Sequence, residues 1–270
     1  MPDEIPSDSK VWEIGRDLAA QLAGSAITLR YPELAVAGAL APIFVKNALD
    51  HARNTCFGGL LAKREQIRLS ALEILVSREI QRRLNQGDQP REDALSEDYI
   101  PERFDADEIT EAIFRIAQRD PEERKLPYIA KLLSSIVFNP QIDAKLAHHL
   151  TSVANSLSFR KLCLLELARD ATRFDLFNDH LDKIGRQNIS EELLSILSDL
   201  FDLKQRTLLF TGSDLDLNAF EIRPAFLRLE RLGALLHETM GLEVIPPWEV
   251  KSLANRLSFG HGPFPPRAHS

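Results

Sequence analysis

Apolar residues recur at three- and four-residue steps along much of the chain, which is the spacing of one face of an α-helix. The clearest stretch ends at Gly87, and arginine and glutamate occupy most of its other positions. Its apolar positions are Leu69, Leu72, Val76, Ile80 and Leu84. This spacing predicts one long amphipathic helix that ends at Gly87.

Helix-start signals divide the middle of the chain into further helices. Asp105 and Asp120 each have a glutamate three residues later, and Ser158 and Ser190 each precede a leucine-rich stretch. Such residues cap the first turn of a helix by accepting a backbone hydrogen bond. We expect Pro127 to bend the helix that follows Asp120, because proline removes a backbone donor. A shorter helix is predicted over 174–184.

The pattern changes near Lys204. Two short apolar runs on either side of "TGSD" predict a hairpin, and "GLEVI" predicts a further strand. The stretch "AFEIRPAFLRLERLGALL" has helical periodicity, and "PPWEVKSLANRLSF" predicts a final helix. This order of helix, hairpin, helix and strand resembles a winged-helix arrangement.

These elements predict a mainly α fold, a multi-helix bundle with a small winged-helix-like α/β element near the C-terminus. Strand-forming residues are sparse, and leucine, alanine, glutamate and arginine dominate, which favours helices. The predicted organisation is apolar helices and the long amphipathic helix over 1–87, an acidic linker over 88–104, a helical core over 105–203, and the winged-helix-like element with a tail over 204–270.

Two apolar stretches near the N-terminus, Leu18–Leu29 and Leu34–Val45, each contain twelve residues without a charge. A helix of that length spans about 18 Å, so neither crosses a bilayer of about 30 Å alone. Pro42 should kink the second stretch. Its apolar residues do not share one face, so it must be covered by protein, in a buried hairpin or an oligomer contact, or by lipid on conditional insertion. These candidate contact residues are Leu34, Val36, Leu40, Ile43, Phe44 and Val45.

The net charge of −7 is unevenly distributed. Residues 88–123 contain thirteen aspartates and glutamates against four arginines, a net charge of −9 that leaves the remainder at +2. The overall acidity therefore does not exclude a nucleic-acid surface elsewhere. The acidic segment itself could be a solvated linker or a docking surface.

Three arginines in the C-terminal region are the candidate contacts for nucleic acid or for a protein partner. On the predicted helix over "AFEIRPAFLRLERLGALL", Arg223, Arg228 and Arg231 lie opposite an apolar arc. Arginines on an exposed helix face could bind phosphates. However, Glu221 and Glu230 border them, so a structural role or a contact with protein is the competing interpretation.

Motifs that carry recognised chemistry are absent from the sequence. It lacks a nucleophile elbow, a Walker loop, a dinucleotide-binding glycine pattern and a metal-ligand spacing, so we expect no cofactor, no metal and no catalytic residue. An enzyme would need residues that converge from distant positions. Cys56 and Cys163 do not form a CxxC pair and are expected to be free thiols of a cytoplasmic protein. The acidic N-terminus does not resemble a signal peptide, although a peripheral membrane location fits the apolar stretches.

Leucine-rich helices run from "KLPYIAKLLSSIVF" to "SFRKLCLLELA" and are followed by the late element "LERLG", residues 229–233. This layout is similar to that of the Abi-alpha abortive-infection family of bacterial helical proteins. The similarity extends from about Arg64 to Leu236. The resemblance implies a bacterial or prophage protein connected with phage defence, and it transfers no catalytic residue.

Two hypotheses about function follow. The first is a non-enzymatic helical protein that acts through self-association or through contacts with protein or membrane. For this protein the resemblance implies a role in phage defence by abortive infection. The alternative is a DNA-binding regulator that uses the C-terminal element.

Overall fold

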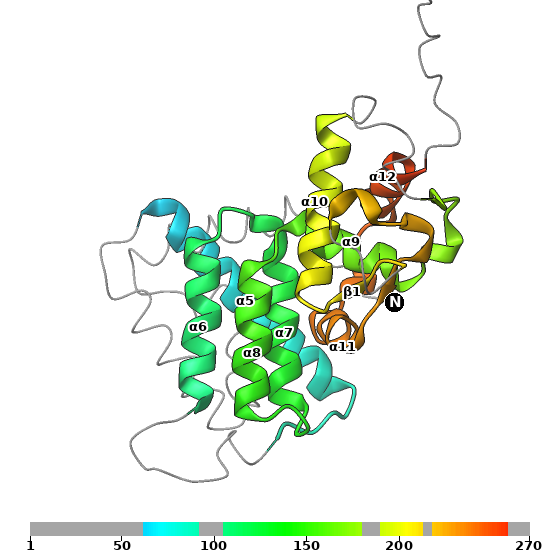
Figure 1. Cartoon of the computed structure of the whole chain (residues 1–270). Coiled ribbons are helices and arrows are strands. Elements are labelled where there is room, and N and C mark those ends of the chain that lie inside the picture. The colour runs from blue at the N-terminus through cyan, green and yellow to red at the C-terminus, as the bar shows by residue number, and fades with distance from the viewer. Residues whose placement is uncertain (1–61, 92–104, 180–189, 213–217, 259–270) are drawn as a thin grey trace, which may run out of the picture. The chain divides into compact units, whose positions relative to one another are not determined.

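The computed structural model describes residues 62–91, 105–179, 190–212 and 218–258 (Figure 1). Over these ranges the chain is mainly helical, as predicted, and the strands form one two-stranded sheet. The chain divides into two compact units, Met1–Leu157 and Ser158–Ser270. The division falls inside the segment 105–203, which the sequence pattern grouped as one helical core.

Unit 1 contains four helices in its described part. Figure 1 shows α6, α7 and α8 side by side, with α5 crossing behind them. Their bounds are α5 Lys63–Asn85, α6 Asp105–Arg119, α7 Leu126–Phe138 and α8 Ala144–Ser156, and a 3-10 turn, Glu123–Lys125, precedes α7.

The long helix α5 is the centre of this unit and not a surface helix. Its predicted apolar positions are buried from Leu69 to Ile80, but so is every residue from 67 to 72. Buried Arg68 donates from Nε to the Ala117 carbonyl at 3.1 Å. A carbonyl in the last turn of α6 has no partner within its own helix, so Arg68 satisfies an acceptor that would otherwise lie unpaired.

Arg91 links the end of α5 to the end of α7. Its side chain is buried, and Nη1 donates to the carbonyls of Ile142 at 2.5 Å and Asn139 at 3.2 Å. Its backbone N–H donates to the Val137 carbonyl at 3.0 Å. A positive charge at the C-terminal end of a helix also interacts favourably with the helix dipole. The first residues of the predicted acidic linker are therefore anchored, while 92–104 lie outside the described residues.

The helix-start predictions hold at Ser158 and Ser190, whose side chains accept the backbone N–H groups three residues later. The prediction for Asp120 and Pro127 is wrong. Asp120 accepts the Glu122 N–H at 2.8 Å and pairs with buried Lys125, so it shapes a turn. Pro127 lies in the first turn of α7, where proline is well tolerated, and does not bend the helix.

Unit 2 is arranged around α9, which has no polar face in its middle. Residues 162–165 of α9 are all buried, and the helix contacts α10, α11, α12 and the strand β2. The bounds in this unit are α9 Phe159–Arg169, α10 Glu191–Gln205, β1 Leu209–Phe210, β2 Arg228–Leu229, α11 Arg231–Met240 and α12 Pro247–Leu257, with 3-10 turns at Ala171–Arg173, Ala219–Glu221, Pro224–Phe226 and Leu242–Val244.

Several predictions for this unit are wrong. The predicted long helix over 219–236 is replaced by two 3-10 turns, β2 and the start of α11. β1 pairs with the distant β2, while most of the strand predicted after "TGSD" lies outside the described residues. The predicted "GLEVI" strand is a 3-10 turn. Residues 174–179 are not helical, because Phe177 exchanges backbone hydrogen bonds with Leu257 and Ala225 of distant segments. The final helix is confirmed as α12.

The winged-helix-like arrangement remains a prediction, and the strand order around it differs from the expected one. The apolar stretches Leu18–Leu29 and Leu34–Val45, with the candidate contacts Leu34, Val36, Leu40, Ile43, Phe44 and Val45, lie outside the described residues. None of the helices in the described ranges combines the length and the apolar character that a membrane span requires.

Candidate functional site

The sheet of unit 2 places an arginine on an aromatic ring. β1 and β2 run antiparallel, with Phe210 opposite Arg228 and Leu209 opposite Leu229. The Arg228 guanidinium carbon lies 3.9 Å from the centroid of the Phe210 ring, which is a cation–π contact. Leu209 is buried, so the Leu209–Leu229 pair faces inward and the Phe210–Arg228 pair lies on the outer side of this short ribbon.

The loop that connects the two strands holds a second arginine against a second ring. Arg223 lies 4.5 Å from the Phe226 ring centroid, and its Nη2 donates to the Gly212 carbonyl. Its backbone N–H donates to the Thr211 carbonyl at 3.1 Å. Gly212 has a φ of 106°, and a Cβ there would lie only 2.9 Å from Arg223 Nε. Arg223 is therefore held by this loop and is only half-exposed.

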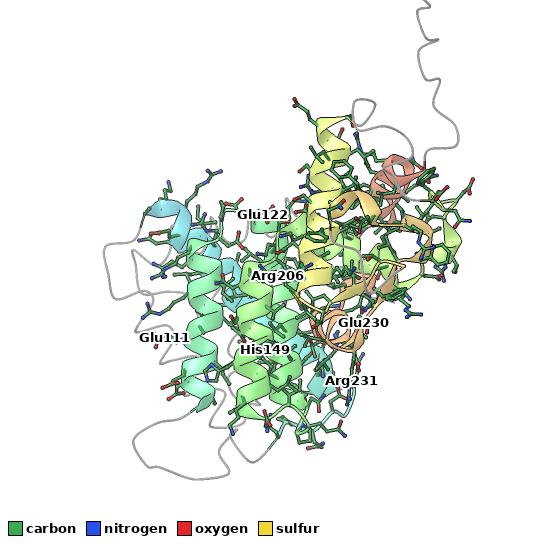
Figure 2. All side chains as sticks on the ribbon, viewed as in Figure 1. Glu111, Glu122, His149, Arg206, Glu230 and Arg231 are labelled. Atoms are coloured by element: carbon green, nitrogen blue, oxygen red, sulfur yellow. The ribbon has the colours of Figure 1, made fainter. Side chains whose placement is uncertain are left out.

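The element "LERLG" forms the corner between β2 and α11. The Glu230 N–H donates to the Leu208 carbonyl at 3.0 Å, which extends the pairing of β2 with β1. A Cβ on Gly233 would lie 2.0 Å from the same Leu208 oxygen, so only glycine allows α11 to approach this closely. Arg231 is the first residue of α11, and Figure 2 labels it beside Glu230.

We call Phe226, Arg228 and Arg231 the arginine–phenylalanine face. Both arginines are exposed and Phe226 is 43% exposed, whereas Leu227 between them is 4% exposed. Phe226 ends a 3-10 turn and Arg228 begins β2, so the two exposed residues lie two positions apart along the chain. Arg228 and Arg231 are three residues apart, so their Cα atoms are separated by no more than about 11 Å.

The two arginines of this face lack carboxylate partners in the part of the chain that the structure describes. Arg228 contacts only the Phe210 ring there, and Arg231 makes no ion pair or side-chain hydrogen bond. The prediction that Arg223, Arg228 and Arg231 share a helix face is wrong, because only Arg231 is helical. Arg228 and Arg231 are nevertheless both exposed.

A buried ionic cluster, which sequence reasoning missed, connects α9 to α11. Glu166 Oε2 lies 2.5 Å from Nε2 of His237, and both side chains are almost fully buried. Arg169 binds the same carboxylate with two hydrogen bonds of 3.0 and 2.9 Å. This hydrogen bonding raises the pKa of Arg169, although partial burial opposes the rise. The cluster joins residues 71 positions apart, so no local pattern could have revealed it.

Ion pairs also connect α9 to α10. Lys161 Nζ lies 2.6 Å from Asp202 Oδ2, and Arg206 Nε lies 2.9 Å from the same oxygen. Arg160 Nε binds Asp199 at 2.5 Å. In each of these contacts the positive group already has a carboxylate, which indicates a structural role.

Metal-binding chemistry finds no support in the described ranges, where no three histidine, cysteine, aspartate or glutamate side chains gather. His148 and His149 of α8 are both exposed, and Figure 2 labels His149. Cys163 is a buried free thiol in the middle of α9.

Comparisons of the chain with family models, with curated proteins and with solved structures found no match.

Proposed function

We propose that this chain is a non-enzymatic helical protein of phage defence that acts through contacts with another protein. The observation that carries the proposal is the arginine–phenylalanine face, because exposed aromatic and arginine side chains are enriched where proteins bind one another. Phe226 is among the most exposed large apolar residues of unit 2, together with Trp248 at 69% and Leu194 at 44%.

The link with phage defence rests on the resemblance to the Abi-alpha family, whose "LERLG" element corresponds to residues 229–233. In this chain that element orients the candidate contact residue Arg231 and packs α11 against Leu208. The "LERLG" resemblance therefore lies within the segment that forms the arginine–phenylalanine face. This is consistent with a mode of action shared with the Abi-alpha family. Self-association or membrane contact through Leu34–Val45 belongs to the same proposal.

The test is a plaque assay on a bacterial host that expresses the full chain. We expect a panel of phages to include some whose efficiency of plating falls at least tenfold, with host growth arrest after infection. The variant Arg231→Glu should restore plating, and Lys145→Glu, an exposed change of equal charge on α8, should not. Unchanged plating across a broad panel would contradict a role in phage defence.

A DNA-binding regulator is the second candidate. It is favoured by two exposed arginines, Arg228 and Arg231, that have no carboxylate partner among the described residues. Phosphate contacts of this kind weaken steeply as salt rises. The expected result would be a gel shift at low salt that is lost when Arg228 and Arg231 both become alanine. A shift that survives the double substitution would remove this candidate.

A further inference from the structure

The arginine–phenylalanine face departs from the way in which unit 2 otherwise uses its arginines. In the described part of this unit, Arg223 is held by the Gly212 carbonyl. The other arginines outside the face each contact a carboxylate, and they are Arg160, Arg169, Arg173, Arg206 and Arg256. Arg228 and Arg231 are the exceptions among these described residues, and they lie three positions apart.

The position of Arg231 is also unfavourable for the stability of its own helix. It is the first residue of α11, where the unpaired N–H groups and the helix dipole favour a negative charge. A cation at this end costs a few tenths of a kcal/mol. Residues that break a local rule without a compensating contact tend to mark functional sites.

We propose that the arginine–phenylalanine face binds an acidic segment of a partner protein, in which carboxylates flank an apolar side chain. The inference rests on the proposed function and specifies its partner. Arg228 and Arg231 present forked donors that match carboxylates, and each can form paired hydrogen bonds. The Phe210 ring supports the flat face of the Arg228 guanidinium, which leaves its N–H edges for the ligand.

Phe226 supplies the apolar part of this recognition. Phe226 is 43% exposed and lies two positions before exposed Arg228. An apolar side chain of the acidic segment, placed between its two bound carboxylates, would cover the Phe226 ring. That contact would remove the apolar surface of both side chains from water. Arginine and an aromatic residue at the centre of a small contact area form the type of cluster that dominates binding energy between proteins.

The extent of the face favours a protein over a nucleic acid. Nucleic-acid affinity depends on many phosphate contacts, whereas this face offers two guanidiniums that have no carboxylate partner in the described ranges. Half-buried Glu230 immediately precedes α11 and lies between Arg228 and Arg231 along the chain. Its carboxylate would repel a continuous line of phosphates. Two separated carboxylates avoid that repulsion more easily.

Fluorescence anisotropy with the full chain tests the proposal. The probe is a labelled synthetic peptide that repeats Glu-Glu-Leu-Phe, and the comparison probes are its Lys-Lys-Leu-Phe counterpart and a single-stranded oligothymidylate. We expect the acidic peptide to bind, to weaken at least threefold when NaCl rises from about 50 to about 300 mM, and to bind better than either comparison probe.

Charge reversal at the face should separate recognition from folding. Arg231→Glu should weaken peptide binding at least tenfold without lowering the melting temperature, because glutamate suits the first turn of a helix. Phe226→Ala should weaken it at least threefold, and Lys145→Glu should leave it unchanged. Equal binding by Arg231→Glu and the unaltered chain would overturn the proposal, and so would absence of peptide binding or preferential binding of the oligothymidylate.

The plaque assay distinguishes this inference from the proposed function. If the acidic peptide binds as expected but no phage is restricted, the inference stands and the defence role fails. If phages are restricted and Arg231→Glu does not restore plating, the defence role stands and this face is not its contact surface.

Discussion

At the scale of single residues, the charged side chains of unit 2 fall into two groups. Lys161, Arg206 and their shared partner Asp202 form a partly exposed network that joins α9 to α10. Arg228 and Arg231 have no such partners in the described chain. The first group contributes modestly to stability, because exposed ion pairs gain little over hydration. The second group makes no such contribution through residues that the structure describes, which is why we propose that it binds a partner.

The Asp202 network makes part of the stability of unit 2 depend on pH. Burial raises the pKa of Asp202, but hydrogen bonds from Lys161 and Arg206 outweigh it, so the pKa lies below the usual value of 3.8. A lowered pKa stabilises the folded state above the unfolded value, and this contribution is lost as the pH falls through the folded pKa. Asp202→Asn should lower the free energy of unfolding at pH 7 by about 0.5–1 kcal/mol.

Chemical denaturation at pH 7 and at about pH 3 measures this contribution, since the difference between the variant and the unaltered chain should shrink at the lower pH. Asp175→Asn is the control, because Asp175 is exposed and has no ion pair with any residue that the structure describes. A difference for Asp202→Asn that stays constant over this range would show that the ion pairs are not its source.

At the scale of elements, the corner between β2 and α11 decides whether the face exists. Leu229 pairs with Leu209, Glu230 continues the pairing, and Gly233 lets the next helix lie directly on the Leu208 backbone. These three contacts all fall within residues 229–233. Arg228 of β2 and Arg231 of α11 are thereby both exposed, although they belong to a strand and a helix separated by one residue.

Gly233→Ala tests this corner. A methyl group at that position would lie 2.0 Å from the Leu208 oxygen, and because the three nearest atoms all belong to the Leu208 backbone, α11 must move. We expect a loss of about 1–3 kcal/mol in the free energy of unfolding, the usual cost of overpacking. Urea denaturation measures it. The exposed neighbour Ala234 offers a control, since Ala234→Ser should change stability by about 0.5 kcal/mol or less.

At the scale of the whole molecule, the two units each have their own central helix. α5 is buried on all sides over 67–72, and α9 is buried over 162–165. Arg91 anchors the end of α7 in unit 1, whereas the corner at Gly233 belongs to unit 2. Units with separate cores are expected to respond to substitutions separately.

Hydrogen exchange of the full chain tests this separation. Arg91→Met leaves buried carbonyls at the end of α7 without their donor, which should cost about 1–3 kcal/mol, and exchange should accelerate in α5 and α7. Gly233→Ala should instead accelerate exchange in α9 and α11. If either substitution accelerates exchange equally in both units, they do not unfold separately.

The sequence by itself determined most of the described helices and several of their boundaries. Local rules suffice for these features, because a capping serine such as Ser158 or Ser190 bonds only three residues away and an apolar stripe repeats within two turns. The same rules failed at Pro127. Local sequence does not distinguish a proline in the first turn of a helix, which is tolerated, from one in its middle, which bends it.

The tertiary structure alone decided which segments pair. β2 forms because Arg228 and Leu229 find Phe210 and Leu209 nearly twenty residues earlier, and this pairing overrides a helical periodicity that the sequence shows clearly. Non-local contacts also place the division between the two compact units after Leu157, because α9 packs against later elements. The sequence identified Arg223, Arg228 and Arg231 as candidates, but only non-local contacts determined that Arg223 is held internally while Arg228 and Arg231 remain exposed.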